Sequence, residues 1–317
     1  MRVLLWHVHG SWTTAFVQGR HDYVLPVDPG RTPDGRGRAR TWDWPASARE
    51  VPIDRLRDEP VDVVVLQRPH EAGLLERWTG LRAGRTVPAV YLEHDTPRGP
   101  AADTRHPVAD RDDLVLVHVT GFNAVMWDAG STPTRVIEHG VVDPGPLWTG
   151  ERERVAAVVN EPVRRWRVAG TDLLVRIVRD VPADVYGMGV AALAGHVPPG
   201  TALREDLPQA RLHQDLAGAR AYLHPYRWTS LGLALVEAMT LGMPVVALAA
   251  TAVPESVPDD AGVVSTDPDL LRDAARRLLA DRDEARERGR AARRHALDRF
   301  SLDRFLTRWD DLFLEVT

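Results

Sequence analysis

The sequence contains no cysteine and no lysine, so all 40 residues counted as lysine or arginine are arginine. The absence of cysteine excludes disulfides, thiolate zinc sites and cysteine nucleophiles. The absence of lysine excludes a P-loop lysine, a pyridoxal Schiff base and a lysine general base. Any phosphate held by a cationic side chain must therefore be held by arginine.

Positive charge and long apolar runs are scarce as well. The formal net charge is −5, so the chain does not sustain the positive field that binds nucleic acid or an anionic bilayer. Its apolar stretches are far shorter than the ~20 residues that span a membrane, and the start of the chain does not have the pattern of a signal peptide. We therefore expect a cytoplasmic protein with no nucleic-acid partner and no integral membrane association. Abundant arginine, alanine and glycine without lysine are typical of a GC-rich bacterial genome.

At roughly 150 residues per domain, the 317 residues of the chain predict two domains. Short runs rich in valine, isoleucine and leucine recur in both halves, and such continuous runs are typical of parallel strands covered by helices on both faces. The expected strands are Val3–Val8, Val61–Leu66, Ala89–Leu92, Leu114–Val119, Arg135–Ile137, Val155–Val159, Ala183–Tyr186, Ala219–Leu223, Val245–Leu248 and Gly262–Val264. Turn-forming residues over 143–150 predict a linker. The pattern therefore predicts an α/β protein with domains at 1–146 and 147–298.

Apolar residues at helical spacing fill several intervals between these runs. The expected helices are Glu71–Leu81, Thr171–Val181, Leu231–Leu241 and Asp267–Ala280. Residues 281–317 also have helical character with a break near Phe300, and the final segment, 299–317, is expected to cross back to the first domain. Residues 28–48 and 96–113 are expected to be loops that follow strands, on the side where doubly wound folds bind ligands.

Residues 221–249 carry the strongest chemical signal. An apolar strand is followed there by a polar turn and by a helix that opens at Ser230, Leu231 and Gly232. The first N–H groups of a helix lack partners and its dipole favours negative charge, so this start predicts a phosphate site. Glu237 lies between apolar neighbours in the same helix, where an unpaired buried carboxylate is costly. We therefore expect Glu237 to be hydrogen-bonded.

This segment resembles the retaining family-4 glycosyltransferases of the GT-B superfamily, in which two Rossmann-like domains face a central cleft. The matching residues are Pro225 of the turn, Gly232 of the helix start, and Glu237-Ala238-Met239 with Gly242, Pro244 and Val245. The resemblance implies that Glu237 binds the ribose hydroxyls of a nucleotide. It also shows a departure, because Thr229 occupies the position of the family's first glutamate, which contacts the donor sugar.

Weaker matches extend the resemblance over most of the chain. Arg164 matches an arginine that neutralises the donor diphosphate in the family, and Ala169 occupies the position of a second cation, a lysine. With no lysine in the chain, Arg165 or Arg167 is the expected replacement.

The first half contributes matches at two strand ends. His94 matches a strand-end histidine that approaches the reacting sugar in the family, and Gly10 with Ser11 resembles the glycine loop beside the donor phosphate. His94 and Thr229 are therefore the expected catalytic residues, and Gly10 and Ser11 are expected to contact the donor.

The resemblance implies transfer of a sugar from a nucleotide diphosphate sugar to a small-molecule or glycan acceptor, with retention of configuration. Arginines and a helix N-terminus would stabilise the departing diphosphate without metal or another cofactor. The donor is expected to be of the UDP, GDP or dTDP type. The sequence leaves the base, the sugar, the acceptor and the oligomeric state open.

Two other classes of function remain open at this point. A nucleotide-sugar binding protein without turnover is suggested by Thr229 and Ala169 at two family positions. A metal-dependent amidohydrolase is suggested by His7 and His9, because alternation along a strand would point both rings to one face, where they could share a metal.

Overall fold

The computed structural model describes all residues from 1 to 317, and the chain divides into two compact units. The first comprises Met1–Val142 with Leu302–Thr317, and the second comprises Asp143–Ser301. The unit limits therefore lie near the predicted domain limits at 146 and 298. Asp143 begins the second unit, where its carboxylate accepts two hydrogen bonds from Arg293, at 2.8 and 2.7 Å.

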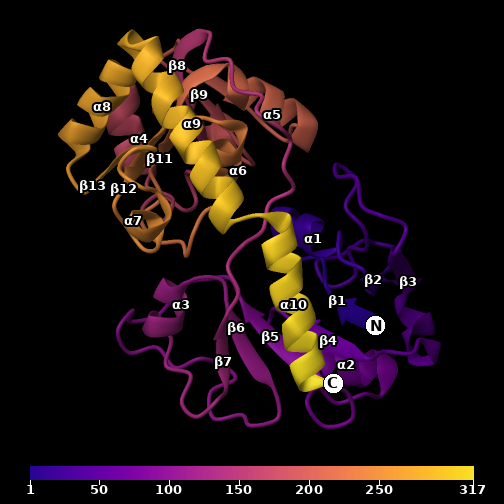
Figure 1. The fold of residues 1–317 in the computed structure, drawn as a ribbon. Coiled ribbons are helices and arrows are strands. Elements are labelled where there is room, and N and C mark those ends of the chain that lie inside the picture. The colour runs from indigo at the N-terminus through magenta and orange to yellow at the C-terminus, as the bar shows by residue number, and fades with distance from the viewer. The chain divides into compact units, whose positions relative to one another are not determined.

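The first unit is built on a seven-stranded parallel sheet with the order β3-β2-β1-β4-β5-β6-β7 (Figure 1). Its strands are β1 Arg2–Leu5, β2 Asp22–Val27, β3 Ala48–Pro52, β4 Val63–Leu66, β5 Ala89–Glu93, β6 Val115–His118 and β7 Thr134–Val136. The order reverses between β1 and β4, so the carboxyl ends of these two strands form the switch point at which open α/β sheets bind ligands.

The helices of the first unit include the last helix of the chain. They are α1 Gly10–Phe16, the 3-10 helix η1 Ile53–Asp58, α2 Glu71–Thr79, α3 Gly121–Met126 and α10 Leu302–Val316. Aromatic rings attach α10 to α1: the ring centroids of Trp12 and Trp309 are 5.7 Å apart, and those of Phe16 and Phe313 are 6.1 Å apart. The predicted return of the C-terminal helix to the first domain is confirmed.

The second unit repeats this plan with a six-stranded parallel sheet in the order β10-β9-β8-β11-β12-β13. Its strands are β8 Arg152–Val158, β9 Ala183–Tyr186, β10 Ala202–Arg204, β11 Ala219–His224, β12 Val245–Leu248 and β13 Gly262–Ser265. Its helices are α4 Thr171–Val178, η2 Val190–Leu193, α5 Gln209–Gly218, α6 Leu233–Leu241, α7 Val253–Ser256, α8 Pro268–Ala280 and α9 Arg282–Arg299. The switch point of this sheet lies between β8 and β11.

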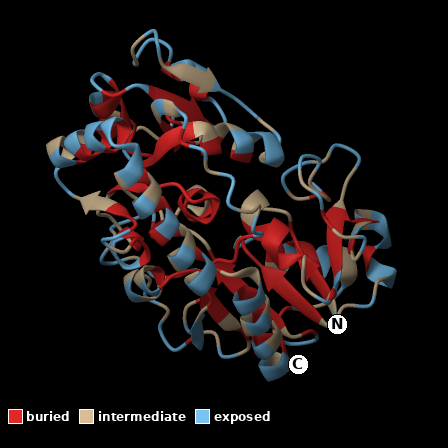
Figure 2. Ribbon diagram, turned by 45° about the horizontal axis from the view of Figure 1, so that its top comes forward, coloured by how far each residue is buried: buried red, intermediate tan, exposed pale blue.

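Buried strands form the core of each unit, as the red ribbons in Figure 2 show. Every residue of β4, β5, β9 and β11 is buried, which is the pattern of strands with helices on both faces. The prediction of two Rossmann-like parallel-sheet domains is therefore confirmed, and all ten expected strands are present. No helix has the length and apolar character needed to cross a membrane.

Three strands, β2, β3 and β10, were missing from the sequence prediction. Pro26 interrupts β2, and proline is a poor strand signal because it cannot donate to the ladder. The two others lie at the sheet edges, where exposed residues break the apolar run. The prediction of β1 was too long, because the strand ends at Leu5, which pairs with Val65 of β4.

Candidate functional site

The candidate site of the second unit lies between β11 and α6, beside the switch point of the sheet. Helix α6 begins at Leu233, two residues later than predicted, and Gly232 is its N-cap. No side chain caps this end, so the site retains the helix N-terminus that the sequence predicted for an anion. Ser230 and Leu231 are buried in front of it, and Thr229 is half-buried.

Glu237 lies in the second turn of α6 and is only 5% exposed. Its Oε2 atom is 3.7 Å from Nε2 of His213 on the neighbouring helix α5. The sequence analysis predicts a buried, hydrogen-bonded carboxylate at this position, and the separation of 3.7 Å from His213 is an ion-pair distance that is longer than a hydrogen bond. The structure supplies His213 as a polar neighbour, and the role of Glu237 toward a ribose stays a prediction.

Two loops are tied together at the carboxyl ends of β8 and β11. Gly170 has a φ of +69°, and a Cβ on it would lie 1.7 Å from the carbonyl oxygen of Pro225, so only glycine fits this crossing. Arg227 donates its backbone N–H to the Val168 carbonyl at 3.0 Å and binds both carboxylate oxygens of Asp172, at 2.9 and 3.1 Å. The backbone around α6 is therefore fixed by the loop that precedes α4.

The arginines predicted to hold a diphosphate line the same loop. Arg164 pairs with Glu161 and Arg167 pairs with Asp172, and both arginine side chains are 69% exposed. Ala169, at the position of the family's second cation, is buried. Each arginine is thus accessible to solvent and to another anion, and the assignment of a phosphate to them stays a prediction.

His224 at the end of β11 was missed in the sequence analysis. It is fully buried, and neither ring nitrogen has a hydrogen-bond partner. Burial lowers the pKa of His224 to about 3, so the ring is neutral at pH 7. A polar residue that ends an otherwise apolar strand next to a turn is the signal that could have found it, because strand ends at the switch point face the ligand.

The first unit brings several predicted residues together at the carboxyl edge of its sheet. His94 follows β5, and its Nε2 atom lies 3.0 Å from Oε1 of Gln67, which follows β4. The amide nitrogen of Gln67 donates to the Trp6 carbonyl at 2.7 Å, which turns Oε1 toward the imidazole. Nε2 of His94 therefore carries the proton, and Nδ1 is left as an acceptor.

The surroundings of His94 keep it neutral. Burial lowers its pKa well below the usual value, and the nearby rings of His9 and His139 lower it further. The centroid of the His9 ring is 4.0 Å from that of His94. Gly10 and Ser11 follow His9 as the first two residues of α1, so these predicted donor contacts lie at the same edge as His94.

His7 does not join this group in the way that the strand argument expected. Because β1 ends at Leu5, strand alternation does not apply to His7 and His9. Nδ1 of His7 lies 3.1 Å from the Gly37 carbonyl and its ring packs edge-on against Trp44, whereas the ring of His9 lies tilted against that of His94. The shared metal-binding face inferred from the sequence is thus not formed.

Residues 203–295 match the family model described as Glycosyl transferases group 1. This segment is similar to that family and is called the group 1 domain below. Alpha-maltose-1-phosphate synthase of Mycolicibacterium smegmatis is 32% identical over 108 residues, which cover 31% of this chain and 28% of that protein. The helix start at Gly232 and the buried Glu237 both lie inside the group 1 domain.

Solved structures match the whole chain, including the first unit. Sucrose-phosphate synthase from Thermosynechococcus elongatus superposes with a TM-score of 0.73 at 13% identity, covering 99% of this chain and 98% of that one. Anabaena HepE, in a structure with UDP and glucose, gives a TM-score of 0.71 at 13% identity and covers 99% of this chain and 100% of its own. These likenesses establish the GT-B fold of two Rossmann-like domains.

Proposed function

We propose that the protein transfers a glycosyl group from a nucleotide diphosphate sugar to a small-molecule or glycan acceptor, with retention and without metal, as a family-4 member. The observation that carries the proposal is the pair formed by the uncapped start of α6 and the buried Glu237 within the group 1 domain. A helix N-terminus suits a phosphate, and a buried carboxylate suits two vicinal ribose hydroxyls.

The chemistry follows from the charges that the domain presents. Breaking the bond to the anomeric carbon leaves negative charge on the diphosphate, and this charge must be stabilised as the sugar gains oxocarbenium character. We assign this role to the N–H groups at the start of α6 and to Arg164 and Arg167. Ser230 and Thr229 are the hydroxyl groups placed beside that helix start, where they would hydrogen-bond the donor.

In the first unit we assign His94 as the group that contacts the donor sugar. Its neutral ring with the proton on Nε2 offers Nδ1 as a hydrogen-bond acceptor for a sugar hydroxyl. Gly10 and Ser11 would let the backbone approach the donor phosphate. UDP is the first nucleotide to test, because HepE was crystallised with UDP-glucose, and a cytoplasmic location remains our expectation.

The test is an assay of donor turnover with UDP-glucose, UDP-N-acetylglucosamine, GDP-mannose and dTDP-glucose in EDTA. Release of the nucleoside diphosphate reports turnover, and proton NMR of the product reports the configuration of the anomeric carbon. We expect turnover of one donor in EDTA and an α-configured product from an α-configured donor. Turnover that requires added Mg²⁺ would contradict the metal-independent mechanism, and a β-configured product would contradict retention.

A nucleotide-sugar binding protein without turnover is the second candidate, and the observation that favours it is the half-buried Thr229 where the family has a glutamate. A threonine binds sugar hydroxyls more weakly than a carboxylate does. Tight nucleotide binding with neither transfer nor donor hydrolysis would support this function. The amidohydrolase alternative has lost its basis, because both sheets are open and not closed into a barrel.

A further inference from the structure

A pocket lies in the second unit, at the other end of α6 from the candidate donor site. It has a volume of about 400 Å³ and is lined by Pro146, Trp148, Thr149, Leu241, Gly242, Arg282, Arg286, Arg290 and Arg293. This volume is in the range of small-molecule sites. Helix α6 ends at Leu241, so its nine residues, at about 1.5 Å each, separate this pocket from Gly232.

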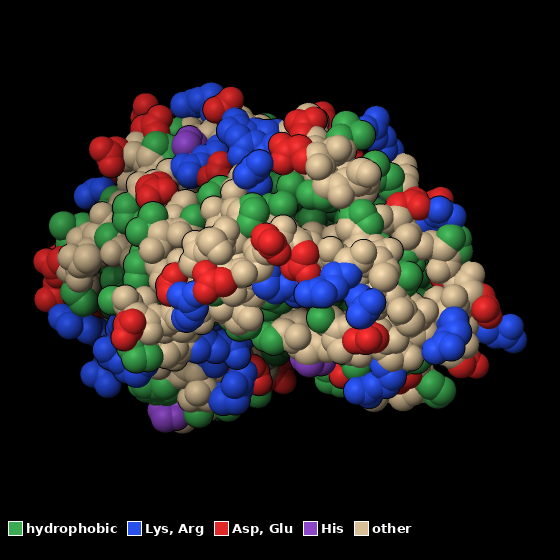
Figure 3. All heavy atoms as spheres, turned by 90° about the horizontal axis from the view of Figure 1, so that it is seen from below, with side chains coloured by type: hydrophobic (Ala, Val, Ile, Leu, Met, Phe, Trp, Pro, Cys, Tyr) green, Lys and Arg blue, Asp and Glu red, His purple; other side chains and the backbone are tan.

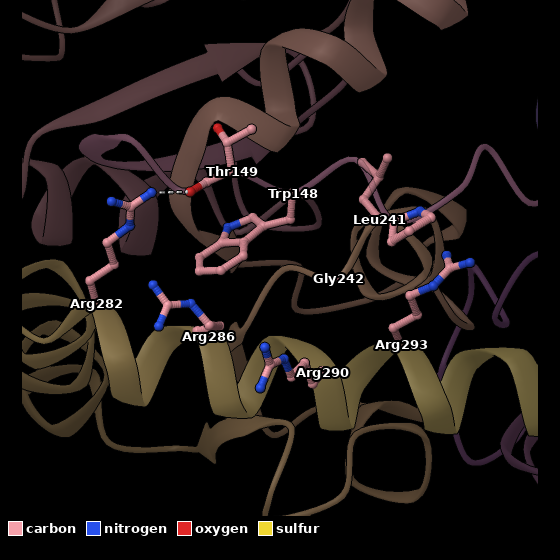
Figure 4. A pocket seen from close by; sticks show the side chains of 9 residues that line it. Trp148, Thr149, Leu241, Gly242, Arg282, Arg286, Arg290 and Arg293 are labelled. Atoms are coloured by element: carbon pink, nitrogen blue, oxygen red, sulfur yellow. Dashed lines mark hydrogen bonds between the residues drawn. The ribbon is translucent and has the colours of Figure 1, made fainter.

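Four arginines of α9 form one wall of the pocket, and no carboxylate lines it. They follow one another at helical spacing, so they share one face of the helix, and Figure 4 shows them projecting from α9 toward the linker segment and the end of α6. Figure 3 shows arginines and carboxylates interspersed over the face of the molecule that it draws. The pocket thus concentrates positive charge in a chain of net charge −5.

The two outer arginines form hydrogen bonds with other groups of the protein. Arg282 donates to the Thr149 carbonyl at 2.9 Å, and Arg293 binds both carboxylate oxygens of Asp143. The two inner arginines differ. Arg286 pairs only with the highly exposed Asp283, and Arg290 has neither a hydrogen bond nor an ion pair. The centre of the pocket therefore offers two guanidinium groups that are available to an anion.

The opposite wall is rigid and presents an aromatic ring. Trp148 donates its Nε1–H to the Ala219 carbonyl at 3.0 Å and its backbone N–H to the Leu241 carbonyl at 3.1 Å. Gly289 allows α9 to approach closely, because a Cβ there would lie 2.1 Å from the Gly242 carbonyl oxygen. The indole and the arginine row are consequently held at a fixed separation, and Figure 4 shows Arg286 and Arg290 beneath the indole.

We propose that this pocket binds a small phosphorylated molecule of the sugar-phosphate class, separately from the donor site. Arg286 and Arg290 hold the phosphate through charge-assisted hydrogen bonds, which the planar guanidinium makes in pairs. The sugar ring lies against the indole of Trp148, whose face suits the C–H side of a pyranose. The site has the polar anchor and the apolar wall that a phosphate ester requires, and it does not depend on the proposed transferase activity.

The test measures binding of glucose 1-phosphate, inorganic phosphate and glucose by calorimetry. The protein is first saturated with the nucleotide that it binds most tightly, so that the donor site is filled. If it binds no nucleotide, the titrations are made in buffer alone. We expect glucose 1-phosphate to bind more tightly than phosphate, and glucose not to bind. Arg290→Ala and Arg286→Ala should each weaken glucose 1-phosphate at least about tenfold, since one hydrogen bond to a charged group is worth ~1.5–3 kcal/mol. The matched control is Arg294→Ala, which removes an exposed arginine of α9 outside the pocket and should change nothing.

Several outcomes would overturn the proposal. Equal affinity of the wild type, Arg290→Ala and Arg294→Ala would show that the pocket is not the site, as would no binding of glucose 1-phosphate at millimolar concentration. Competition between nucleotide and glucose 1-phosphate would place the phosphate in the donor site instead. Binding to phosphatidylglycerol vesicles that Arg290→Ala abolishes, without binding of glucose 1-phosphate, would assign the arginines to a lipid surface and reject the small molecule.

Discussion

Gly232 lies directly against the imidazole of His224, so that a Cβ on Gly232 would come within 2.6 Å of Cε1 of the ring. This pair joins the end of β11 to the N-cap of α6. The buried ring, which has no hydrogen-bond partner of its own, sets how closely the strand and the helix start approach. The missing side chain at position 232 is therefore a requirement of packing, in addition to any requirement of a bound phosphate.

We predict that Gly232→Ala lowers the free energy of unfolding by about 1–3 kcal/mol, the usual cost of overpacking. It should also weaken nucleotide binding, because relief of the clash displaces the start of α6. Thermal unfolding and calorimetric titration of the same preparation measure both effects. Gly195→Ala is the control, since a Cβ there meets nothing within 4 Å, and an equal loss of stability in that variant would contradict the packing argument.

Gln67 fixes the protonation of His94, and its substitution should move a pH profile. Gln67→Glu places a carboxylate near Nε2 of His94, where the amide oxygen now lies at 3.0 Å, so the pKa of His94 should rise. If neutral His94 contacts the donor sugar, the acidic limb of the kcat profile shifts to higher pH while the nucleotide Kd is unchanged. A parallel loss of activity at all pH values would indicate a purely structural role for Gln67.

The stability of the fold should fall in acid because some buried histidines are neutral in the folded protein. Burial, with a smaller effect of His106, lowers the pKa of His118 to about 4 in the folded protein, so the unfolded chain takes up a proton first as the pH falls. The stability is full above the unfolded pKa of about 6.5 and is lost toward pH 4, by about 1.4 kcal/mol per pH unit. Burial likewise lowers the pKa of His7 to about 4, which adds to this slope.

His118→Leu tests this dependence without creating a new unsatisfied group, because neither ring nitrogen of His118 has a partner. We expect His118→Leu to lose less stability than the wild type does when the pH falls from 7.5 to 5. Thermal unfolding across pH 4.5–7.5 measures it. His196→Leu, at an exposed histidine, is the control, and an unchanged pH slope in His118→Leu would contradict the account.

The fold was largely predictable because buried parallel strands appear in the sequence as continuous runs of apolar residues. All ten expected strands exist, and the three strands that the sequence did not predict are two edge strands, β3 and β10, and β2. β10 lies at a sheet edge with an exposed or half-buried pattern, and β2 contains Pro26. Edge strands are stabilised by one neighbour only, so their sequences carry little of the apolar signal.

Some features of the candidate site could be predicted from consecutive residues, whereas others depend on contacts between distant parts of the chain. The start of α6 and Glu237 were found because strand, turn and helix are consecutive in the chain. The hydrogen bond from His94 to Gln67 and the contact between His224 and Gly232 were not found, because they depend on which strand ends become neighbours. The ion pair between Arg227 and Asp172 was not predicted either, because it joins residues that are far apart in sequence.

The central claim is that Glu237 and the start of α6 bind a nucleoside diphosphate without metal. Calorimetric titration of the protein with UDP, GDP, dTDP and ADP in EDTA, repeated with Glu237→Gln and with the exposed Glu287→Gln as control, tests it most directly. We predict micromolar binding of one diphosphate, weakened by ~2–3 kcal/mol in Glu237→Gln and unchanged in the control. Binding that is equally tight in folded Glu237→Gln, or absent for all four nucleotides with and without Mg²⁺, would contradict the account.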